Sequence, residues 1–181
     1  MHHRLRSLPS RPLWVGLPLL SCVLASNPAC AADCLDALFT CETNHAGKYA
    51  QICATEVKVG EVWKDIYYRF GAEGVQPELV YPAKPVPAKR VFFFSHTVVG
   101  SDYRVSVRFV SGDYTYRIYS NSGQGTAGVQ VSDSRGNVVS NARCIERPHM
   151  FPSYLQRALA CDKDTQYGAA ACADKPLHVP K

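Results

Sequence analysis

Arginine and tyrosine side chains alternate with apolar ones in two neighbouring segments of the chain, 103–110 and 114–119. The guanidinium group of arginine is a planar fork that holds carboxylate or phosphate through two hydrogen bonds. Arginine and tyrosine together are also enriched at the centres of protein binding surfaces. These residue types therefore indicate recognition of an anionic or protein ligand. The predicted binding residues are Arg104, Arg108, Arg117 and Tyr119.

The turn Gly112-Asp113 sets the position of these arginines relative to one another. Glycine at the first position of a two-residue loop is typical of a type II′ hairpin turn. A two-residue loop opposes Val107 to Ile118 and leaves one face wholly apolar, whereas a three-residue loop would oppose Val107 to Arg117. Mixed faces are unfavourable where one face is buried, so we expect the two-residue loop. Its pairs are Ser111 with Tyr114, Phe109 with Tyr116, and Val107 with Ile118.

This register places Arg108 directly across from Arg117 on the outer face of the hairpin. Like charges that face each other in a ladder are unfavourable. We therefore expect compensation, either from an acid on a neighbouring strand or from an anion outside the protein. If the pair only covers a sheet, Arg108→Thr should stabilise the fold slightly, by up to about 1 kcal/mol. If the pair holds an anion or a partner's carboxylates, the same change should weaken binding and leave the fold intact. A salt bridge from either arginine to an acid on a third strand would remove the motive for a binding pair.

Residues 1–31 have the three parts of a secretory signal. Three arginines and no acid precede a short apolar stretch, and Ala29-Cys30-Ala31 ends the segment in small residues. We predict cleavage after Ala31 and a periplasmic or secreted protein. A rival interpretation takes Leu19-Leu20-Ser21-Cys22 as a lipoprotein processing site, with a lipid anchor on Cys22, although Leu20 is bulky for its place in that pattern. The apolar stretch is shorter than the roughly 20 residues of a membrane span, so no span is expected.

Six of the eight cysteines follow the predicted signal, and an even set in an exported chain indicates disulfides. Two pairings look local, across a hairpin and within the C-terminal tail, and the third pairs the two remaining cysteines. The predicted pairs are Cys41 with Cys53, Cys161 with Cys172, and Cys34 with Cys144. No C-x-x-C spacing occurs, which argues against a zinc ribbon and a thioredoxin-type redox site.

The chain after the signal, residues 32–181, carries 17 basic and 15 acidic residues, a net charge of +2. This mild balance argues against nucleic-acid binding, which usually requires a strongly basic stripe. The length suits a single domain.

Short segments rich in β-branched and aromatic residues predict a small antiparallel β-sandwich or barrel, with a sheet core over about 38–147. The expected strands are 38–41, 49–53, 63–70, 78–81, 91–94, 103–110, 114–119, 129–131 and 137–139. The proline-rich segment 82–87 predicts an extended crossover. In the C-terminal region 148–181, we expect Ser153 to cap one short helix, 154–160, followed by a tail.

Other motifs point away from catalysis. Gly123–Gly128 has the spacing G-x-G-x-x-G, but strand-forming residues follow it instead of the helix that a dinucleotide site needs, so we expect a hairpin loop. No G-x-S-x-G elbow occurs, and the cysteines are assigned to disulfides. The histidines lack metal or triad spacing and are expected to be structural or on the surface; they are His45, His96, His149 and His178. We therefore expect no cofactor and no metal, and name no catalytic residue.

Four further motifs occur between residues 37 and 147. They are Phe39-Thr40-Cys41-Glu42-Thr43, Gly47-Lys48-Tyr49 with Ile52-Cys53, Tyr68-Arg69-Phe70-Gly71, and Glu78-Leu79-Val80-Tyr81-Pro82. In the forms F-[ST]-C-x-T, G-K-x-x-x-[IVL]-C, Y-R-[FY]-G and E-L-x-[YF]-P, they resemble a group of small exported proteobacterial proteins. The resemblance implies export and a β fold and attaches no activity. Ser111-Gly112-Asp113-Tyr114 also resembles the S-G-x-x-Y loop of periplasmic lysozyme inhibitors, one residue short.

These observations favour an exported, non-enzymatic binding or inhibitor module that uses the arginine–tyrosine face. Its expected partner is a protein or an anionic envelope glycan. Two alternatives stay open: an enzyme acting on an envelope polymer, and a purely structural envelope component. A deep pocket joining His96 or His149 to an acid would favour the enzyme, and a flat arginine–tyrosine face would favour binding.

Overall fold

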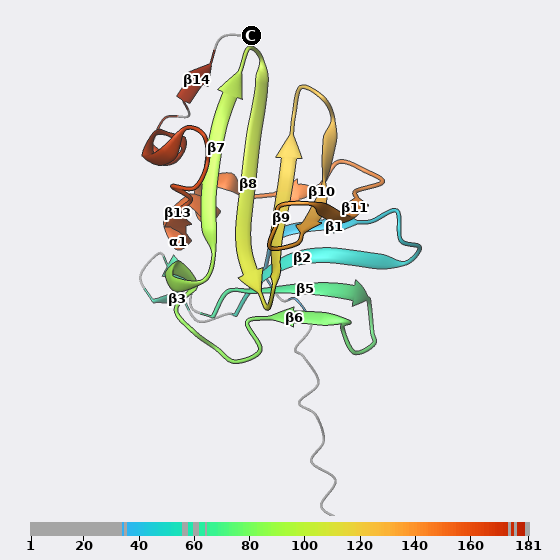
Figure 1. Ribbon diagram of the computed structural model, residues 1–181. Helices are drawn as coiled ribbons and strands as arrows, with labels where there is room; N and C mark the ends of the chain where they lie inside the picture. The colour runs from blue at the N-terminus through green and yellow to red at the C-terminus, as the bar shows by residue number, and fades with distance from the viewer. Residues whose placement is uncertain are drawn as a thin grey trace, which may run out of the picture.

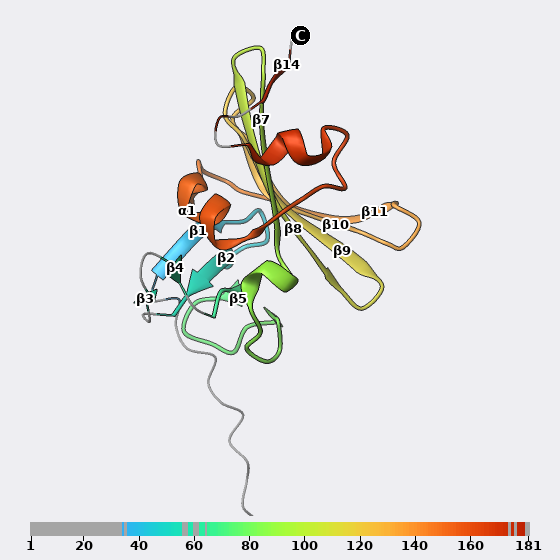
Figure 2. The same cartoon turned by 90° about the vertical axis from the view of Figure 1, so that its left-hand side faces the viewer.

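The structure is a computed structural model that describes residue 34 and residues 36–55, 58–59, 62–63, 65–173, 175 and 177–179. The predicted signal and its cleavage site lie outside the described residues. Two β-sheets face each other, and their strands cross steeply (Figures 1 and 2), which is the orthogonal form of sheet packing. With its one short α-helix and its disulfides, this arrangement confirms the predicted fold class. Within the described residues, no helix has both the length and the apolar character to cross a membrane.

The five-stranded sheet is antiparallel and has the order β12-β1-β2-β5-β6. Its strands are β1 (Asp36–Glu42), β2 (Lys48–Ala54), β5 (Tyr67–Ala72), β6 (Leu79–Tyr81) and β12 (His149–Met150). A separate two-stranded ribbon joins β3 (Lys58–Val59) to β4 (Val62–Trp63). Cross-strand rows of aromatic and aliphatic residues, such as Phe39, Ile52 and Tyr68, point from this sheet into the core.

The seven-stranded sheet has the order β11-β10-β9-β8-β7-β13, and β14 also pairs with β7. Its strands are β7 (Phe93–Val99), β8 (Asp102–Ser111), β9 (Tyr114–Asn121), β10 (Thr126–Ser132), β11 (Val138–Arg143), β13 (Ala160–Cys161) and β14 (Leu177–Val179). The two C-terminal strands run parallel to β7, which the sequence did not predict. They follow a helix and a 3-10 turn that return the chain to the edge of the sheet; these elements are α1 (Pro152–Ala158) and η2 (Gly168–Cys172).

The β8–β9 hairpin has the predicted register. Val107 faces Ile118, and Arg108 faces Arg117. Gly112 in the turn has φ 58°, a left-handed conformation that glycine adopts without strain. The predicted apolar face is confirmed, because Val107 and Ile118 are fully buried. The motif 123–128 lies in the β9–β10 hairpin, as expected, with no helix following it.

The core lies between the sheets and is rich in stacked rings. Phe109 is 0 % exposed and lies between two tyrosines, 4.5 Å from the ring of Tyr81 and 4.7 Å from the ring of Tyr116. Successive side chains of a strand point to opposite faces of the sheet. Because Phe109 points into the core, Arg108 beside it on β8 points to the outer face.

Two local expectations are refined. Residues 82–87 do connect the sheets, from β6 to β7, through the 3-10 turn η1 (Ala88–Arg90). The helix begins two residues earlier than predicted, and Ser153 does not cap it. Phe151 occupies the cap position without a side-chain hydrogen bond, and Pro152 begins the helix. Proline suits this position because its fixed φ is helical and the missing N–H would have no helical partner.

The predicted disulfide pairing is right for Cys161–Cys172 and wrong for the other two bonds. The observed bonds are Cys34–Cys53, Cys41–Cys144 and Cys161–Cys172. In the β1–β2 ladder, Cys41 lies opposite Ala50, three residues along β2 from Cys53. Since a strand rises about 3.3 Å per residue, this offset places the two cysteines beyond the roughly 4.4–6.8 Å between Cα atoms that a disulfide needs.

Candidate binding face on the seven-stranded sheet

The predicted binding residues share the outer face of the seven-stranded sheet. Alternation along β8 sends Val105 and Val107 into the core and Arg104 and Arg108 outward. Across the ladder, β9 presents its outward side chains beside them. The outward pairs are Arg104 with Asn121, Ser106 with Tyr119, and Arg108 with Arg117.

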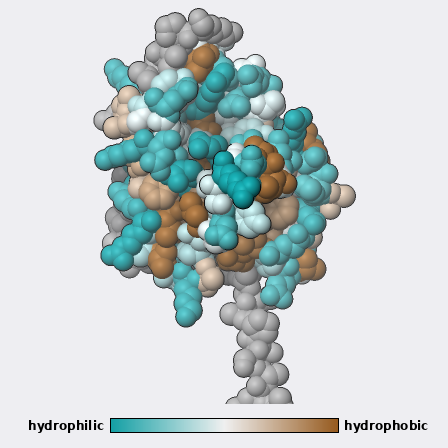
Figure 3. Space-filling model, in the orientation of Figure 1, coloured by the Kyte–Doolittle hydropathy of each residue, from teal (hydrophilic) through white to brown (hydrophobic). Residues whose placement is uncertain are grey.

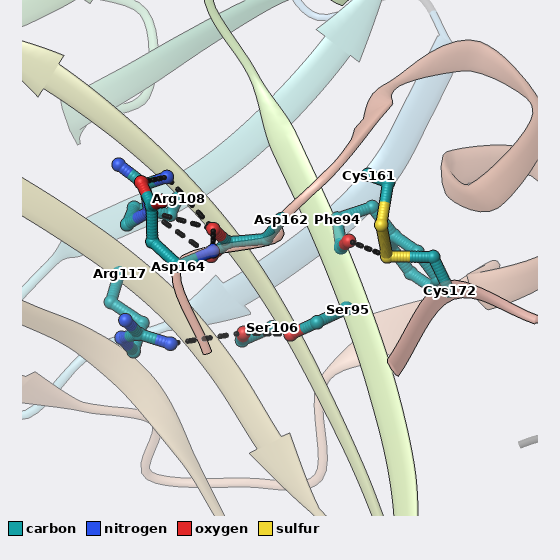
Figure 4. Close-up of polar contacts among 9 residues, drawn as sticks. All are labelled: Phe94, Ser95, Ser106, Arg108, Arg117, Cys161, Asp162, Asp164 and Cys172. Atoms are coloured by element: carbon teal, nitrogen blue, oxygen red, sulfur yellow. Dashed lines mark hydrogen bonds and ion pairs between the residues drawn. A yellow bond between two sulfur atoms is a disulfide. The ribbon is translucent and has the colours of Figure 1, made fainter. Parts of the chain in front are cut away.

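Arg108 is neutralised from within the chain. Its Nε and Nη2 donate to both carboxylate oxygens of Asp162 at 2.8 to 3.1 Å, and Nη2 also donates to Asp164 at 2.7 Å (Figure 4). Asp162 is 0 % exposed and the Arg108 side chain 12 % exposed. The hydrogen bond with Asp162 raises the pKa of Arg108, although burial opposes this. Of the two forms of compensation expected for Arg108, the structure has the acid from its own chain. The opposed pair as such therefore gives no reason to expect an external anion, and the case for a ligand depends on Arg117 alone.

Arg117 has a different environment. Its Nη1 donates to the Oγ of Ser106 at 3.4 Å, and the Ser106 and Ser95 hydroxyls are 2.9 Å apart (Figure 4). In the described part of the chain, no carboxylate pairs with Arg117. The arginine is half-buried. Of the two opposed arginines, Arg117 is therefore the one with its charge still available to a ligand.

The outer face is hollowed rather than flat. A cavity of about 520 Å³ lies between the sheet and the segment after β13. We call it the arginine hollow and define it by Ser95, Arg104, Ser106, Arg117, Tyr119 and Thr165. Arg108 does not line it, so the structure brings three of the four predicted binding residues to one cavity. In the view of Figure 3, hydrophilic side chains cover much of the surface, with apolar patches between them.

Neighbouring bonds hold the hollow in shape. Arg104 donates through Nε to Asp102 at 2.8 Å, and the same carboxylate accepts the N–H of Gly123 at 2.7 Å. The hydroxyl of Tyr119 donates to Asn141 at 3.2 Å. The charge of Arg104 is thus balanced.

The wall of the hollow formed by the C-terminal segment was missed from the sequence. Asp164, Thr165 and Tyr167 line it. The Cys161–Cys172 disulfide closes this segment, and the Cys172 sulfur lies 3.2 Å from the carbonyl oxygen of Phe94 (Figure 4). The Oγ1 of Thr165 is buried and has no hydrogen-bond partner. The signal that could have indicated this wall is the pair of acids at 162 and 164, inside the loop that the predicted Cys161–Cys172 disulfide closes.

The histidines are engaged differently from those of a catalytic dyad. His96 is buried; its Nε2 lies 2.8 Å from the carbonyl oxygen of Ala173 and its Nδ1 lies 3.2 Å from the hydroxyl of Tyr103. Because a carbonyl only accepts, Nε2 carries the hydrogen. His149 is exposed and packs edge-on against Phe151. His96 lines the arginine hollow together with Asp164, but the two form no ion pair. Among the described residues, neither histidine forms an ion pair with an acid, and no cluster of three ligand side chains could hold a metal.

A second cavity of about 470 Å³ opens between the two sheets. Its walls are aromatic and aliphatic, including Tyr68, Phe70 and Tyr116, and the ion pair of Lys48 with Glu78, at 2.8 Å, lies at its edge. Burial raises the pKa of the Tyr68 hydroxyl above the usual tyrosine value. None of the predicted binding residues lines this cavity.

Comparisons with protein-family models, curated proteins and solved structures find no match for this chain. Its function must therefore be inferred from its own side chains. The clearest difference among them is between the two opposed arginines: Arg108 is paired with carboxylates, and Arg117 is not.

Proposed function

We propose that this chain is an exported, non-enzymatic binding module that holds an anionic ligand in the arginine hollow. The observation that carries the proposal is the state of Arg117. It lines a cavity, it is half-buried, and within the described residues it has a hydroxyl for a partner and no carboxylate. A charge in such a place is stabilised by an opposite charge, and a planar guanidinium suits a carboxylate or a phosphate.

The lining favours an acidic sugar over a simple ion. The cavity of about 520 Å³ lies within the range of roughly 300–1,000 Å³ found for small-molecule sites. Around Arg117 it presents neutral hydroxyl and amide groups that both donate and accept hydrogen bonds, as sugar hydroxyls require. These groups are Ser95, Ser106, Tyr119, Asn121, Gln130 and Thr165. The carboxylate of Asp164 also lines the hollow, and its charge is paired with Arg108. A uronic acid unit of an envelope glycan combines one carboxylate with several hydroxyls.

The second candidate is an acidic side chain of a protein partner. Tyr119 beside Arg117 favours it, because these two residue types recur at the centres of protein interfaces. A periplasmic or secreted location would suit both an envelope glycan and a protein partner. Three disulfides fit a secreted protein, and the signal pattern of residues 1–31 supports the periplasm or the medium.

Isothermal titration with three probes tests the proposal: glucuronate, uncharged glucose and N-acetyl-glutamate amide. We expect glucuronate to bind, glucose to bind at least tenfold more weakly, and Arg117→Gln to weaken glucuronate at least tenfold, since a hydrogen bond to a charged group contributes about 1.5–3 kcal/mol. Arg135→Gln is the matched control, because Arg135 is exposed in the β10–β11 turn. Equal binding of the two acids would favour the protein partner. Unchanged binding in Arg117→Gln would reject the hollow. Incubation with an oligosaccharide that contains uronic acid tests the enzyme alternative separately, and turnover of that oligosaccharide would favour it.

A further inference from the structure

The five-stranded sheet carries a buried arginine on its outer face. Tyr68 and Phe70 pack into the core, so Arg69 between them points outward from β5. The ladder places Gln51 of β2 beside it. Despite this outward direction, Arg69 is 4 % exposed and Gln51 is 8 % exposed. An arginine is thus largely shielded from bulk water on the outer face of the five-stranded sheet.

The donors of Arg69 are poorly satisfied. Its Nη2 lies 3.5 Å from the carbonyl oxygen of Ala72, at the outer limit of a hydrogen bond, and its Nε is buried with no partner. Across the described residues, no carboxylate forms an ion pair with it. A buried charge is costly unless an opposite charge and hydrogen bonds accompany it.

Arg108 shows what the same chain does with a less buried arginine. Its side chain is 12 % exposed, and two carboxylates hold it. Arg69 is a more buried residue and has neither. The contrast indicates that a counter-charge for Arg69 is missing from the described part of the chain.

Arg69 lines a cavity of about 290 Å³ together with Gln51, Cys34, Glu73 and Gly74. The amide nitrogen of Gln51 donates one hydrogen to Thr40 at 3.3 Å and has a second hydrogen to offer. Arg69 and Gln51 therefore present hydrogen-bond donors to the cavity. Glu73 is an exposed acid on the same lining and opposes an anion by its charge.

We propose that this cavity is a second binding site, for the carboxylate or equivalent oxyanion of a small ligand, with Arg69 as the charge that holds it and Gln51 as an added donor. The site is independent of the arginine hollow, because it uses the other sheet and no residue of that hollow. Its volume accommodates a short organic acid or a single inorganic oxyanion.

Thermal unfolding at constant ionic strength tests the site, with acetate, sulfate or phosphate replacing chloride. We expect the midpoint of the wild-type protein to rise and saturate with at least one of these anions. Arg117→Gln, which removes the charge of the arginine hollow, should keep a saturable rise. The double variant Arg69→Met/Arg117→Gln should lose it, because Met keeps the apolar stem of Arg69 and removes its charge. Acetate against sulfate and phosphate separates a planar carboxylate site from a tetrahedral one. A saturable rise that persists in the double variant, or a rise in Arg117→Gln that never saturates, would overturn the proposal.

Two further measurements test the site even if the Arg69→Met substitution prevents folding. A wild-type crystal soaked in the anion that raises the midpoint should show density for that anion within hydrogen-bond distance of the Arg69 guanidinium, and its absence there counts against the site. Glu73→Gln removes the opposing charge and should tighten anion binding several-fold. If Glu73→Gln instead lowers the midpoint in chloride and leaves no anion effect, Glu73 is itself the counter-ion of Arg69 and the proposal is wrong.

Discussion

Asp162 holds Arg108 through both carboxylate oxygens across 54 residues of sequence. The contact explains how two arginines can face each other in one ladder, because the C-terminal segment supplies the charge that Arg108 needs. The contact also gives the two opposed arginines different roles. Arg108 is part of the structure, and Arg117 remains available in the hollow.

Removing Arg108 should therefore destabilise the protein, contrary to the slight gain expected from the hairpin alone. Arg108→Thr leaves Asp162 buried without its partner, and breaking a buried pair in this way typically costs about 3–5 kcal/mol. Urea unfolding of wild type and variant measures the change. Arg117→Thr is the matched control and should change the free energy of unfolding by less than about 1 kcal/mol, in the stabilising direction. An Arg108→Thr protein as stable as wild type would show that the ion pair is not structural.

The hairpin and the ion pair mark what the sequence can and cannot predict. The register of β8 and β9 follows from local features, a Gly112-Asp113 turn and an alternating apolar pattern that a one-residue slip would expose. The partner of Arg108 depends on β13 pairing with β7, which involves residues far apart in the chain. The two-residue strand Ala160–Cys161 is too short to have a sequence pattern that predicts its pairing with β7.

The disulfides show the same limit. The local bond Cys161–Cys172 spans 11 residues and was predicted, whereas Cys41–Cys144 spans 103 residues and was not. Cys41 and Cys53 are close in sequence, but the hairpin register separates them. Predicting disulfides from short sequence separation fails where the strand register places two cysteines several residues apart along the ladder.

The Cys41–Cys144 bond should stabilise the fold more than Cys161–Cys172. In the chain-entropy model a loop of about 100 residues is worth about 4.7 kcal/mol and one of about 15 residues about 3 kcal/mol. We expect the double variant Cys41→Ala/Cys144→Ala to lose more stability than Cys161→Ala/Cys172→Ala in guanidinium unfolding. Peptide mapping without reduction should recover Cys41 linked to Cys144. Recovery of Cys41 linked to Cys53 would contradict the observed bonds.

Phe109 should be among the most sensitive core positions. It is fully buried and stacks between Tyr81 and Tyr116. Phe109→Ala should cost about 3–5 kcal/mol, since it removes a large ring and leaves a cavity. Val110→Ala, at the next residue and 45 % exposed, should stay within about 0.5 kcal/mol of wild type. Similar losses for the two variants in urea unfolding would argue against the observed orientation of β8.

Alkaline pH should weaken the fold through Tyr68. Burial is the main cause that raises the pKa of its hydroxyl, and the nearby Tyr116 adds to it. Because the folded-state pKa is the higher one, the stabilisation is complete below the usual tyrosine value of about 10 and declines as the pH rises, by up to about 1.4 kcal/mol per pH unit. Unfolding free energies of wild type and Tyr68→Phe, measured from about pH 8 to about pH 11, should diverge above about pH 10. Parallel curves would show that Tyr68 ionises equally well in the folded protein.

The most direct test of the account is a crystal structure of the wild-type protein with glucuronate. We expect the carboxylate of the sugar within hydrogen-bond distance of the Arg117 guanidinium, in the hollow between β9 and the segment at 164–167, while Arg108 keeps its bonds to Asp162. An Arg117 that pairs with an acid of its own chain, or a glucuronate that binds elsewhere while the hollow holds only water, would contradict the proposed binding function.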